Sequence, residues 1–308
     1  MFRKSILSIS LLLGLLFGAA ACGSASVSKN AQPGGLKIVA TTTIVGDVVR
    51  QIAGEQSQVT TLLPVGADPH SFQPTPQDVV KVADAGVIFS NGAGLEEFLQ
   101  PLLKNAGSKA EVFPVSENIQ LLDAQGPHAS DHPGGDPHTW FDPNNVIAWT
   151  QVIEQKLSAL DPANAQTYAA NAQAYRQKLT ELDTWIQDQV SQIPGPERQL
   201  VSDHTVFTYF AQRYGFTQDG AILPGYSTMA EPSAKELASL EDAIRSLGVK
   251  AVFVGETANS SLAERVAKDT STQLVFLYTG SLSAAEGPAS SYLDLMRYDV
   301  SEIVKALK

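Results

Sequence analysis

The sequence contains a single cysteine among 308 residues, which rules out an internal disulfide bond. It also excludes a zinc or iron–sulfur site built from several cysteines. Basic residues are scarce as well, because 21 Lys and Arg stand against 32 Asp and Glu and give a formal net charge of −11. Nucleic-acid-binding domains carry a basic face, so we expect no nucleic-acid partner.

The first residues have the layout of a secretory signal. Arg3 and Lys4 precede an apolar run over residues 6–17, and small residues lead to Cys22. The run is too short for a permanent membrane span, and no membrane helix is predicted after it. The Ala-Ala-Ala-Cys end resembles a bacterial lipobox. We therefore expect residues 1–21 to be a lipoprotein signal peptide. Acylated Cys22 would then anchor the protein in the bilayer, on the outer face of the bacterial cell membrane.

Residues 22–35 are rich in Gly, Ser and Pro and are predicted to be a flexible tether. Beyond them the chain is apolar enough for a packed core, since 44% of all residues are hydrophobic. Short apolar runs alternate with longer amphipathic ones, which predicts an α/β fold with parallel sheets. The first strands are expected at residues 37–42, 58–64, 86–91 and 111–115, and helices at residues 44–54 and from Thr75.

A long helical pattern interrupts this alternation. Residues 143–160 are predicted to be helical, and apolar residues then recur every three or four positions from Tyr168 to Val190. A helix over 162–190 would be about 40 Å long, which is too long for a crossover within one lobe. Strands resume at residues 200–202, 251–254 and 274–278, and a last helix is expected at 291–307. The predicted parts are an N-terminal lobe (36–160), a rigid linking helix (161–193) and a C-terminal lobe (194–308).

Three of the five histidines occupy related positions. His70 and His204 each follow a predicted strand, and His138 precedes a predicted helix. In open α/β sheets, ligands bind beyond the carboxyl ends of the strands. One such histidine is more often an ordinary polar residue, but three together indicate a metal site, and neutral imidazoles suit Zn²⁺. The ring nitrogen that does not bind the metal usually donates a hydrogen bond to a carboxylate, and the candidate carboxylates near the histidines in the sequence are Asp68, Asp142 and Asp203.

Four segments resemble the metal-binding lipoproteins of bacterial zinc and manganese ABC importers: residues 66–78, 136–143, 202–207 and 231–233. The resemblance implies two α/β lobes, each with a mainly parallel sheet, joined by one long helix with the metal between them. His70 and His138 would come from the first lobe and His204 from the second. It also implies a monomer that binds its metal outside the cytoplasm, delivers it to a membrane permease and is not an enzyme.

The metal follows from the ligand types. Manganese members of the family usually have Glu where this chain has His204, and three imidazoles favour Zn²⁺ over the harder Mn²⁺. His128 and His132 lie in a loop that resembles a short version of the His-rich segment of zinc members. That loop is either a transient metal-capturing segment or simply a solvated one.

The fourth ligand is an open question. The family commonly supplies an Asp after the last strand, and Gly280 stands at that place here. The fourth position would hold water, Glu286 or Glu256. Three histidines and a water also describe a catalytic zinc site, so an extracytoplasmic zinc hydrolase is one alternative, although the chain lacks His-Glu-x-x-His. A manganese- or iron-binding homologue with a cell-adhesion role is another. The sequence favours a zinc-binding protein of an ABC importer.

Overall fold

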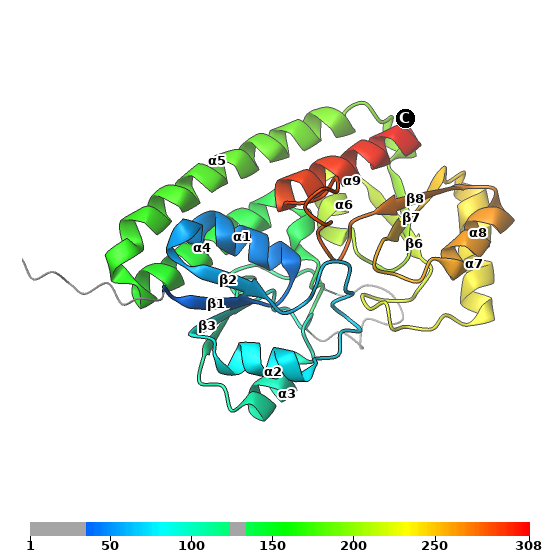
Figure 1. Cartoon of the computed structure of the whole chain (residues 1–308). Helices are drawn as coiled ribbons and strands as arrows, with labels where there is room; N and C mark the ends of the chain where they lie inside the picture. Colours follow the sequence, from blue (N-terminus) through cyan, green and yellow to red (C-terminus); the bar gives the residue numbers. More distant parts are fainter. Residues whose placement is uncertain (1–34, 124–133) are drawn as a thin grey trace, which may run out of the picture. The chain divides into compact units, whose positions relative to one another are not determined.

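The computed structural model describes residues 35–123 and 134–308. Cys22, His128, His132 and the predicted signal peptide lie outside these residues. Gly34–Lys308 is one compact unit, and its described residues form two parallel four-stranded sheets flanked by helices (Figure 1). The predicted α/β class with two parallel sheets is therefore confirmed. Within the described residues, no helix is both long enough and apolar enough to cross a membrane.

The first sheet has the strand order β2-β1-β3-β4, with all neighbours parallel. Its strands and helices alternate along the chain as β1 (Lys37–Ala40), α1 (Thr43–Ala53), β2 (Gln58–Thr61), α2 (Pro76–Ala83), β3 (Val87–Ser90), α3 (Leu99–Ala106) and β4 (Glu111–Pro114). Helix α2 begins where the sequence predicts: Thr75 and Asp78 form a capping box, and Pro76 occupies the first turn.

The second sheet repeats this order as β6-β5-β7-β8, again all parallel. Its elements are β5 (Gln199–Ser202), α6 (Thr208–Tyr214), β6 (Thr217–Ala221), α7 (Ala234–Leu247), β7 (Ala251–Gly255), α8 (Ser261–Thr270), β8 (Gln273–Leu277) and α9 (Tyr292–Leu307). The carboxyl ends of its strands lead into the loops that carry His204 and Gly280.

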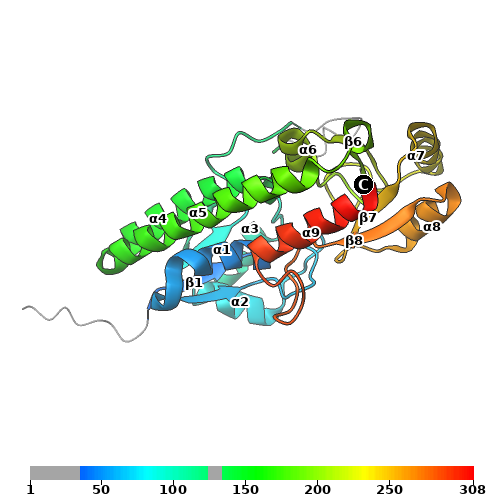
Figure 2. The same cartoon turned by 90° about the horizontal axis from the view of Figure 1, so that it is seen from above.

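Two long helices lie between the sheets in the sequence, α4 (Pro143–Leu160) and α5 (Ala165–Val190). Helix α5 has 26 residues and is therefore about 39 Å long. It packs along its length against α4, and α1 and α9 lie beside its N-terminal and C-terminal halves (Figures 1 and 2). The face that it buries is the one its apolar spacing predicts: Tyr168, Ala172, Tyr175, Leu179, Leu182, Ile186 and Val190.

The buried apolar residues divide into three clusters. The largest one joins one face of each sheet to α1, α4, α5 and α9. A second cluster lies between the second sheet and helices α7 and α8, and a third lies between the first sheet and helices α2 and α3. Both sheets are thus covered on both faces, as parallel sheets require, and one continuous core holds the two lobes together.

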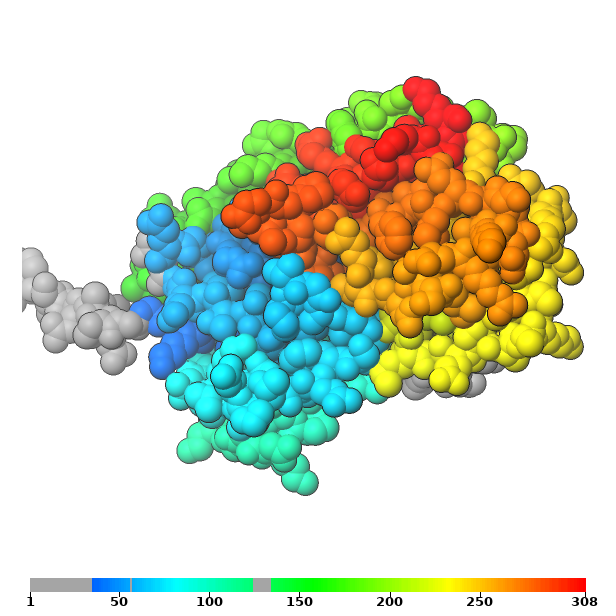
Figure 3. Space-filling model, turned by 45° about the vertical axis from the view of Figure 1, so that its right-hand side comes forward, coloured from blue at the N-terminus to red at the C-terminus, as the bar shows by residue number. Residues whose placement is uncertain are grey.

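Polar contacts also join the lobes beside the loop after β8. Ser281 Oγ accepts the backbone N–H of Gly66 (2.9 Å) and lies 3.2 Å from Thr43 Oγ1. Asp47 in α1 accepts the backbone N–H of Tyr292 (2.9 Å) at the start of α9. Figure 3 shows the segment before α9, in orange-red, lying against the blue surface of the first lobe. The C-terminal residues are therefore part of the interface near the candidate site.

Candidate metal centre

The structure brings His70, His138 and His204 together. His138 is central: its Nε2 atom lies 3.2 Å from Nε2 of His70 and 3.3 Å from Nε2 of His204. One ligand atom from each ring lies within 4.8 Å of the other two, and no carboxylate of the described residues belongs to this group. Three segments far apart in the sequence therefore present three nitrogen ligands to one point.

The three rings differ in their access to solvent. His138 is 1% exposed and His204 is 3% exposed, whereas His70 is only partly buried. Trp140 packs edge-on against His138, with 5.3 Å between the ring centroids. The centre is thus closed on the side of His138 and His204, and His70 forms its more accessible side.

The two Asp-Pro-His sequences form the same local turn. Asp68 Oδ1 accepts the backbone N–H of His70 (3.0 Å), and Asp136 Oδ1 accepts that of His138 (2.9 Å). A carboxylate that accepts the backbone N–H of the residue two positions further along the chain fixes the conformation of a loop that has no helix or strand hydrogen bonds to hold it. Asp68 Oδ2 also accepts the hydroxyl of Thr228, a residue of the second lobe. The turn that positions His70 is therefore tied to both lobes.

Two imidazole rings are oriented by carboxylates. The Nδ1 atom of His138 lies 2.8 Å from Asp136 Oδ1, and that of His204 lies 2.8 Å from Asp203 Oδ1. When Nδ1–H donates to the carboxylate, the Nε2 lone pair is left free for a metal ion, and the carboxylate makes it more basic. The two carboxylates thus fix the orientation of both rings and favour the neutral tautomer with the proton on Nδ1, which is the form that a metal ligand needs.

Charge interactions act on the His204–Asp203 pair as well. Burial works to lower the pKa of the His204 imidazole, but the Asp203 carboxylate outweighs it, and the pKa is raised. Burial likewise works to raise the pKa of Asp203, but His204 and the backbone N–H of Gly255 hold that pKa below its ordinary value. Asp203 is therefore ionised and fixed between β5 and β7, where it fixes the His204 ring.

Asp136 rather than Asp142 orients the His138 ring. Asp142, predicted to hold a ligand ring, instead caps α4 by accepting the backbone N–H of Asn144 (2.8 Å). The ring of His138 is held by Asp136, which the sequence analysis did not select. The signal that could have found it is the repeated Asp-Pro-His sequence, because Asp68 and Asp136 precede their histidines by the same two positions.

Gly280 borders the histidines. It lines a cavity of about 10 Å³ together with the three imidazoles, Trp140, Thr257 and Thr279. A space of that size holds about one water molecule. The two carboxylates considered as a fourth ligand, Glu256 and Glu286, are exposed side chains, and neither belongs to the histidine group.

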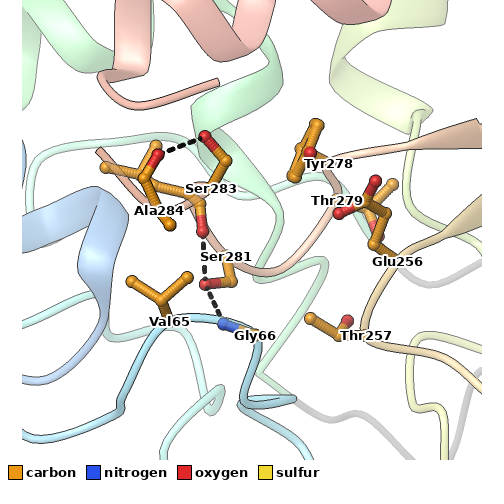
Figure 4. Close-up of a pocket in the computed structure, with 10 residues that line it drawn as sticks. Val65, Gly66, Glu256, Thr257, Tyr278, Thr279, Ser281, Ser283 and Ala284 are labelled. Atoms are coloured by element: carbon orange, nitrogen blue, oxygen red, sulfur yellow. Dashed lines mark hydrogen bonds between the residues drawn. The ribbon is translucent and has the colours of Figure 1, made fainter. Parts of the chain in front are cut away.

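Glu256 lines a different cavity, of about 130 Å³, between the lobes (Figure 4). Figure 4 shows Glu256 next to Tyr278 and Thr279 on one wall of the cavity, and Val65 and Gly66 of the first lobe on the wall across from it. The pKa of Tyr278 is raised to about 12 by burial, by the negative charge of Glu256 and by a hydrogen bond to that carboxylate. Thr257 and Thr279 line this cavity and the histidine cavity alike, so the two are neighbours.

Known proteins share this architecture. A family model described as the periplasmic component A of a zinc-uptake complex matches residues 38–306. The manganese-binding lipoprotein MntA of Halalkalibacterium halodurans is 37% identical over 290 residues, which cover 94% of each chain. The manganese ABC transporter substrate-binding lipoprotein PsaA of Streptococcus pneumoniae is 30% identical and covers 99% of each chain.

Solved structures agree with the sequence comparisons. The periplasmic zinc-binding protein TroA from Treponema pallidum superposes with a TM-score of 0.81 at 26% identity, over 89% of this chain and 99% of that one. A manganese-bound periplasmic metal-binding protein from Candidatus Liberibacter asiaticus superposes with a TM-score of 0.78 at 28% identity, over 88% and 99% of the two chains.

Proposed function

The chain belongs to the family of periplasmic A components of zinc-uptake complexes, and from that premise we propose that the ion it carries is Zn²⁺. It is the extracytoplasmic metal-binding component of an ABC importer and not an enzyme. Its relatives are named lipoproteins, and such proteins work with a membrane permease. The choice among metals, the ligand set and the mode of anchoring are the parts that we infer.

The spacing of two of the three imidazole nitrogen pairs fits a tetrahedral zinc site. In a tetrahedral site with Zn–N distances of about 2.0–2.1 Å, neighbouring ligand nitrogens lie about 3.3 Å apart. The Nε2 atom of His138 lies 3.2 Å from that of His70 and 3.3 Å from that of His204. The ligand chemistry points the same way, because imidazole suits zinc whereas Mn²⁺ prefers carboxylate and other oxygen ligands.

The fourth position would hold a water molecule. Gly280 offers no side chain, and the cavity beside it, of about 10 Å³, has room for about one water. The hydroxyls of Thr257 and Thr279 line the same space and could bond to such a water. Glu256 and Glu286 are less suited to coordinate the ion because both are exposed and stand outside the histidine group.

Manganese is the competing candidate, and the names of relatives favour it. MntA and PsaA are both named for manganese, and the MtsA proteins of Streptococcus pyogenes are named for iron. An identity of 30–37% supports the assignment of this chain to the family better than it supports the transfer of a relative's metal. We therefore base the choice of Zn²⁺ over Mn²⁺ on the three-histidine ligand group rather than on the names of the relatives.

Competition calorimetry on residues 34–308, the compact unit, tests the assignment. The metal-free protein is titrated with Zn²⁺, with Mn²⁺, and with Mn²⁺ after saturation with Zn²⁺. We expect Zn²⁺ to bind at least about 100-fold more tightly and to resist displacement, in line with the Irving–Williams order for nitrogen ligands. Equal affinities, or displacement of Zn²⁺ by Mn²⁺, would reject zinc. The same titration of His138→Ala is expected to show no tight binding and serves as the control for the site.

Anchoring is proposed through an acylated Cys22, which lies outside the described residues. Growth with a radiolabelled fatty acid should label the wild-type protein but not Cys22→Ser. Label in both proteins would place the lipid elsewhere. For His128 and His132, which also lie outside the described residues, replacement of both by Ala is expected to slow uptake at limiting zinc if the loop captures metal. Unchanged uptake would assign them to a solvated loop.

A further inference from the structure

A third and larger cavity also has His70 in its wall. Its volume is about 230 Å³, so it has room for several water molecules. Both lobes contribute to it, and the lining residues are His70, Ala93, Gly94, Leu95, Glu97, Gly134, Gly135, Pro137, Ser227 and Met229. We refer to it as the outer cavity, and to the space of about 10 Å³ among the three imidazoles as the inner cavity.

Of the residues that the structure describes, His70 is the one that lines both cavities. It is also the only partly buried member of the histidine group, since His138 and His204 are 1% and 3% exposed. A cation that passes between the two cavities would therefore meet the His70 ring. The outer cavity is large enough for a hydrated ion, whereas the inner one has room for about one water besides the ligands.

Glu97 supplies the negative charge of the outer cavity. It is an exposed side chain, and it is the only carboxylate among the described residues that line this space. The second lobe contributes Met229 to the lining, and this side chain is 66% exposed. A carboxylate at the mouth of a cavity raises the local concentration of cations and speeds their binding.

The wall next to Glu97 is fixed by buried hydrogen bonds. The carboxylate of Glu96 accepts the backbone N–H groups of Asn91 (2.7 Å) and Gly92 (3.0 Å) and the hydroxyl of Thr41 (2.6 Å). The Asn91 side chain in turn donates to the Pro137 carbonyl (2.9 Å), next to His138. These contacts hold the loop that carries Glu97 against the loop that carries a ligand.

We propose that the metal ion enters and leaves the centre through the outer cavity, past His70, and that Glu97 receives the hydrated cation on the way. This inference rests on the proposed function, because it presumes that the three histidines bind a divalent metal. The rival route is the cavity of about 130 Å³ lined by Glu256. No histidine is among the described residues that line that cavity, and the residues that it shares with the inner cavity are Thr257 and Thr279, not a ligand.

Stopped-flow mixing of the metal-free protein with Zn²⁺ tests the route. We expect Glu97→Gln to lower the association rate about 3–10-fold at low ionic strength. The difference should shrink at physiological salt, where the Debye length falls from about 30 Å to about 8 Å. Glu97 would act on the passage of the ion in both directions. In Glu97→Gln the dissociation rate should therefore fall together with the association rate, and the equilibrium affinity should change less than either rate.

Two matched control variants show whether the slower association is specific to the outer cavity. Glu256→Gln removes the same charge from the rival cavity. Glu111→Gln removes it from an exposed position at the start of β4, at the amino ends of the strands and away from the carboxyl ends that lead to Glu97. Both are expected to associate at the wild-type rate. A slow Glu256→Gln together with a fast Glu97→Gln would assign the route to the rival cavity and overturn the proposal.

A change on the second lobe provides an independent check. Met229→Lys places a positive charge at the outer cavity and should slow association, whereas the neutral Met229→Gln should not. Wild-type rates in both Glu97→Gln and Met229→Lys would overturn the route. Failure of the wild-type protein to bind Zn²⁺ or Mn²⁺ at equilibrium would instead overturn the proposed function, so the two failures are distinguishable.

Discussion

Gly280 lies in close contact with Pro69, across the two lobes. A β-carbon placed on Gly280 would stand 3.1 Å from Pro69 Cδ and 3.1 Å from Thr257 Oγ1. Such spacing is tight but short of a clash, so the neighbours would need to yield by only a few tenths of an ångström. The absence of a side chain at this point leaves room for about one water beside the histidines.

Gly280→Asp should add a carboxylate to the three imidazoles. An oxygen ligand with a negative charge suits Mn²⁺, so we expect the Mn²⁺ affinity to rise at least about 10-fold relative to Gly280→Ala. The alanine variant carries the same β-carbon without the carboxylate and thus isolates the steric cost. Calorimetry with each metal measures the difference, and equal Mn²⁺ affinities for the two variants would contradict it.

Asp136→Asn should weaken metal binding about 10–100-fold, because Asp136 holds the His138 ring through Nδ1. Asp142→Asn is the matched control, since Asp142 caps α4 and Asn caps helices about as well. We expect its affinity to equal that of the wild type. The opposite ranking of the two variants would show that Asp142 rather than Asp136 supports the site.

Asp299→Asn should stabilise the protein at neutral pH. Burial raises the pKa of Asp299 well above its ordinary value of 3.8, although the carboxyl accepts the Tyr278 backbone N–H (2.9 Å). Above about pH 4 the unfolded chain releases this proton and the folded protein keeps it, so stability falls as the pH rises. Asn keeps the acceptor and cannot ionise.

Thermal unfolding of wild type and Asp299→Asn across pH 4–8 measures this effect. The variant should melt higher at pH 7, by about 2–4 °C for each kcal/mol gained, and the gap should close toward pH 4. A gap that stays constant over this range would argue against the titration of Asp299.

Tyr292→Phe should destabilise the protein by about 1–3 kcal/mol. The buried Tyr292 hydroxyl donates to the Trp140 carbonyl (2.7 Å), and its loss leaves that carbonyl without this partner. Tyr298→Phe, a change of the same kind on the same helix in a partly buried position, is expected to cost less than about 0.5 kcal/mol. Urea denaturation followed by circular dichroism compares the two, and equal costs would contradict the role assigned to Tyr292.

The amphipathic elements could be predicted from the sequence because their apolar spacing is strong. Helix α4 occupies the predicted residues 143–160, and α5 buries every residue of its predicted stripe. Strand β6 (Thr217–Ala221) was missed: it contains Asp219 and Gly220, lies at the edge of the sheet and has only one neighbouring strand. Pairing with β5 holds β6 in place, but the polar residues of β6 lack the apolar alternation from which a strand can be predicted.

The site could be predicted only in part. The sequence selected the histidines that the structure gathers, because their strand-end positions converge in this fold. It could not show which carboxylate faces a ring, since Asp136 and Asp142 are both close to His138 in the sequence and only the course of the loop separates them. The lobe boundaries at residues 160 and 194 stay a prediction, because the described lobes share one core.

The contact of α9 with the first lobe has a consequence for the newly made chain. Asp47 bonds to Tyr292, 245 positions further on, and the hydroxyl of Tyr292 reaches the segment that follows His138. Contacts that span so much sequence form only after nearly all of the chain is present. A chain that is cut short before its last helix, or is still emerging, would lack these contacts. The two ties that Tyr292 makes to Asp47 and Trp140 would therefore be among the last to form, once the end of the chain has been synthesised.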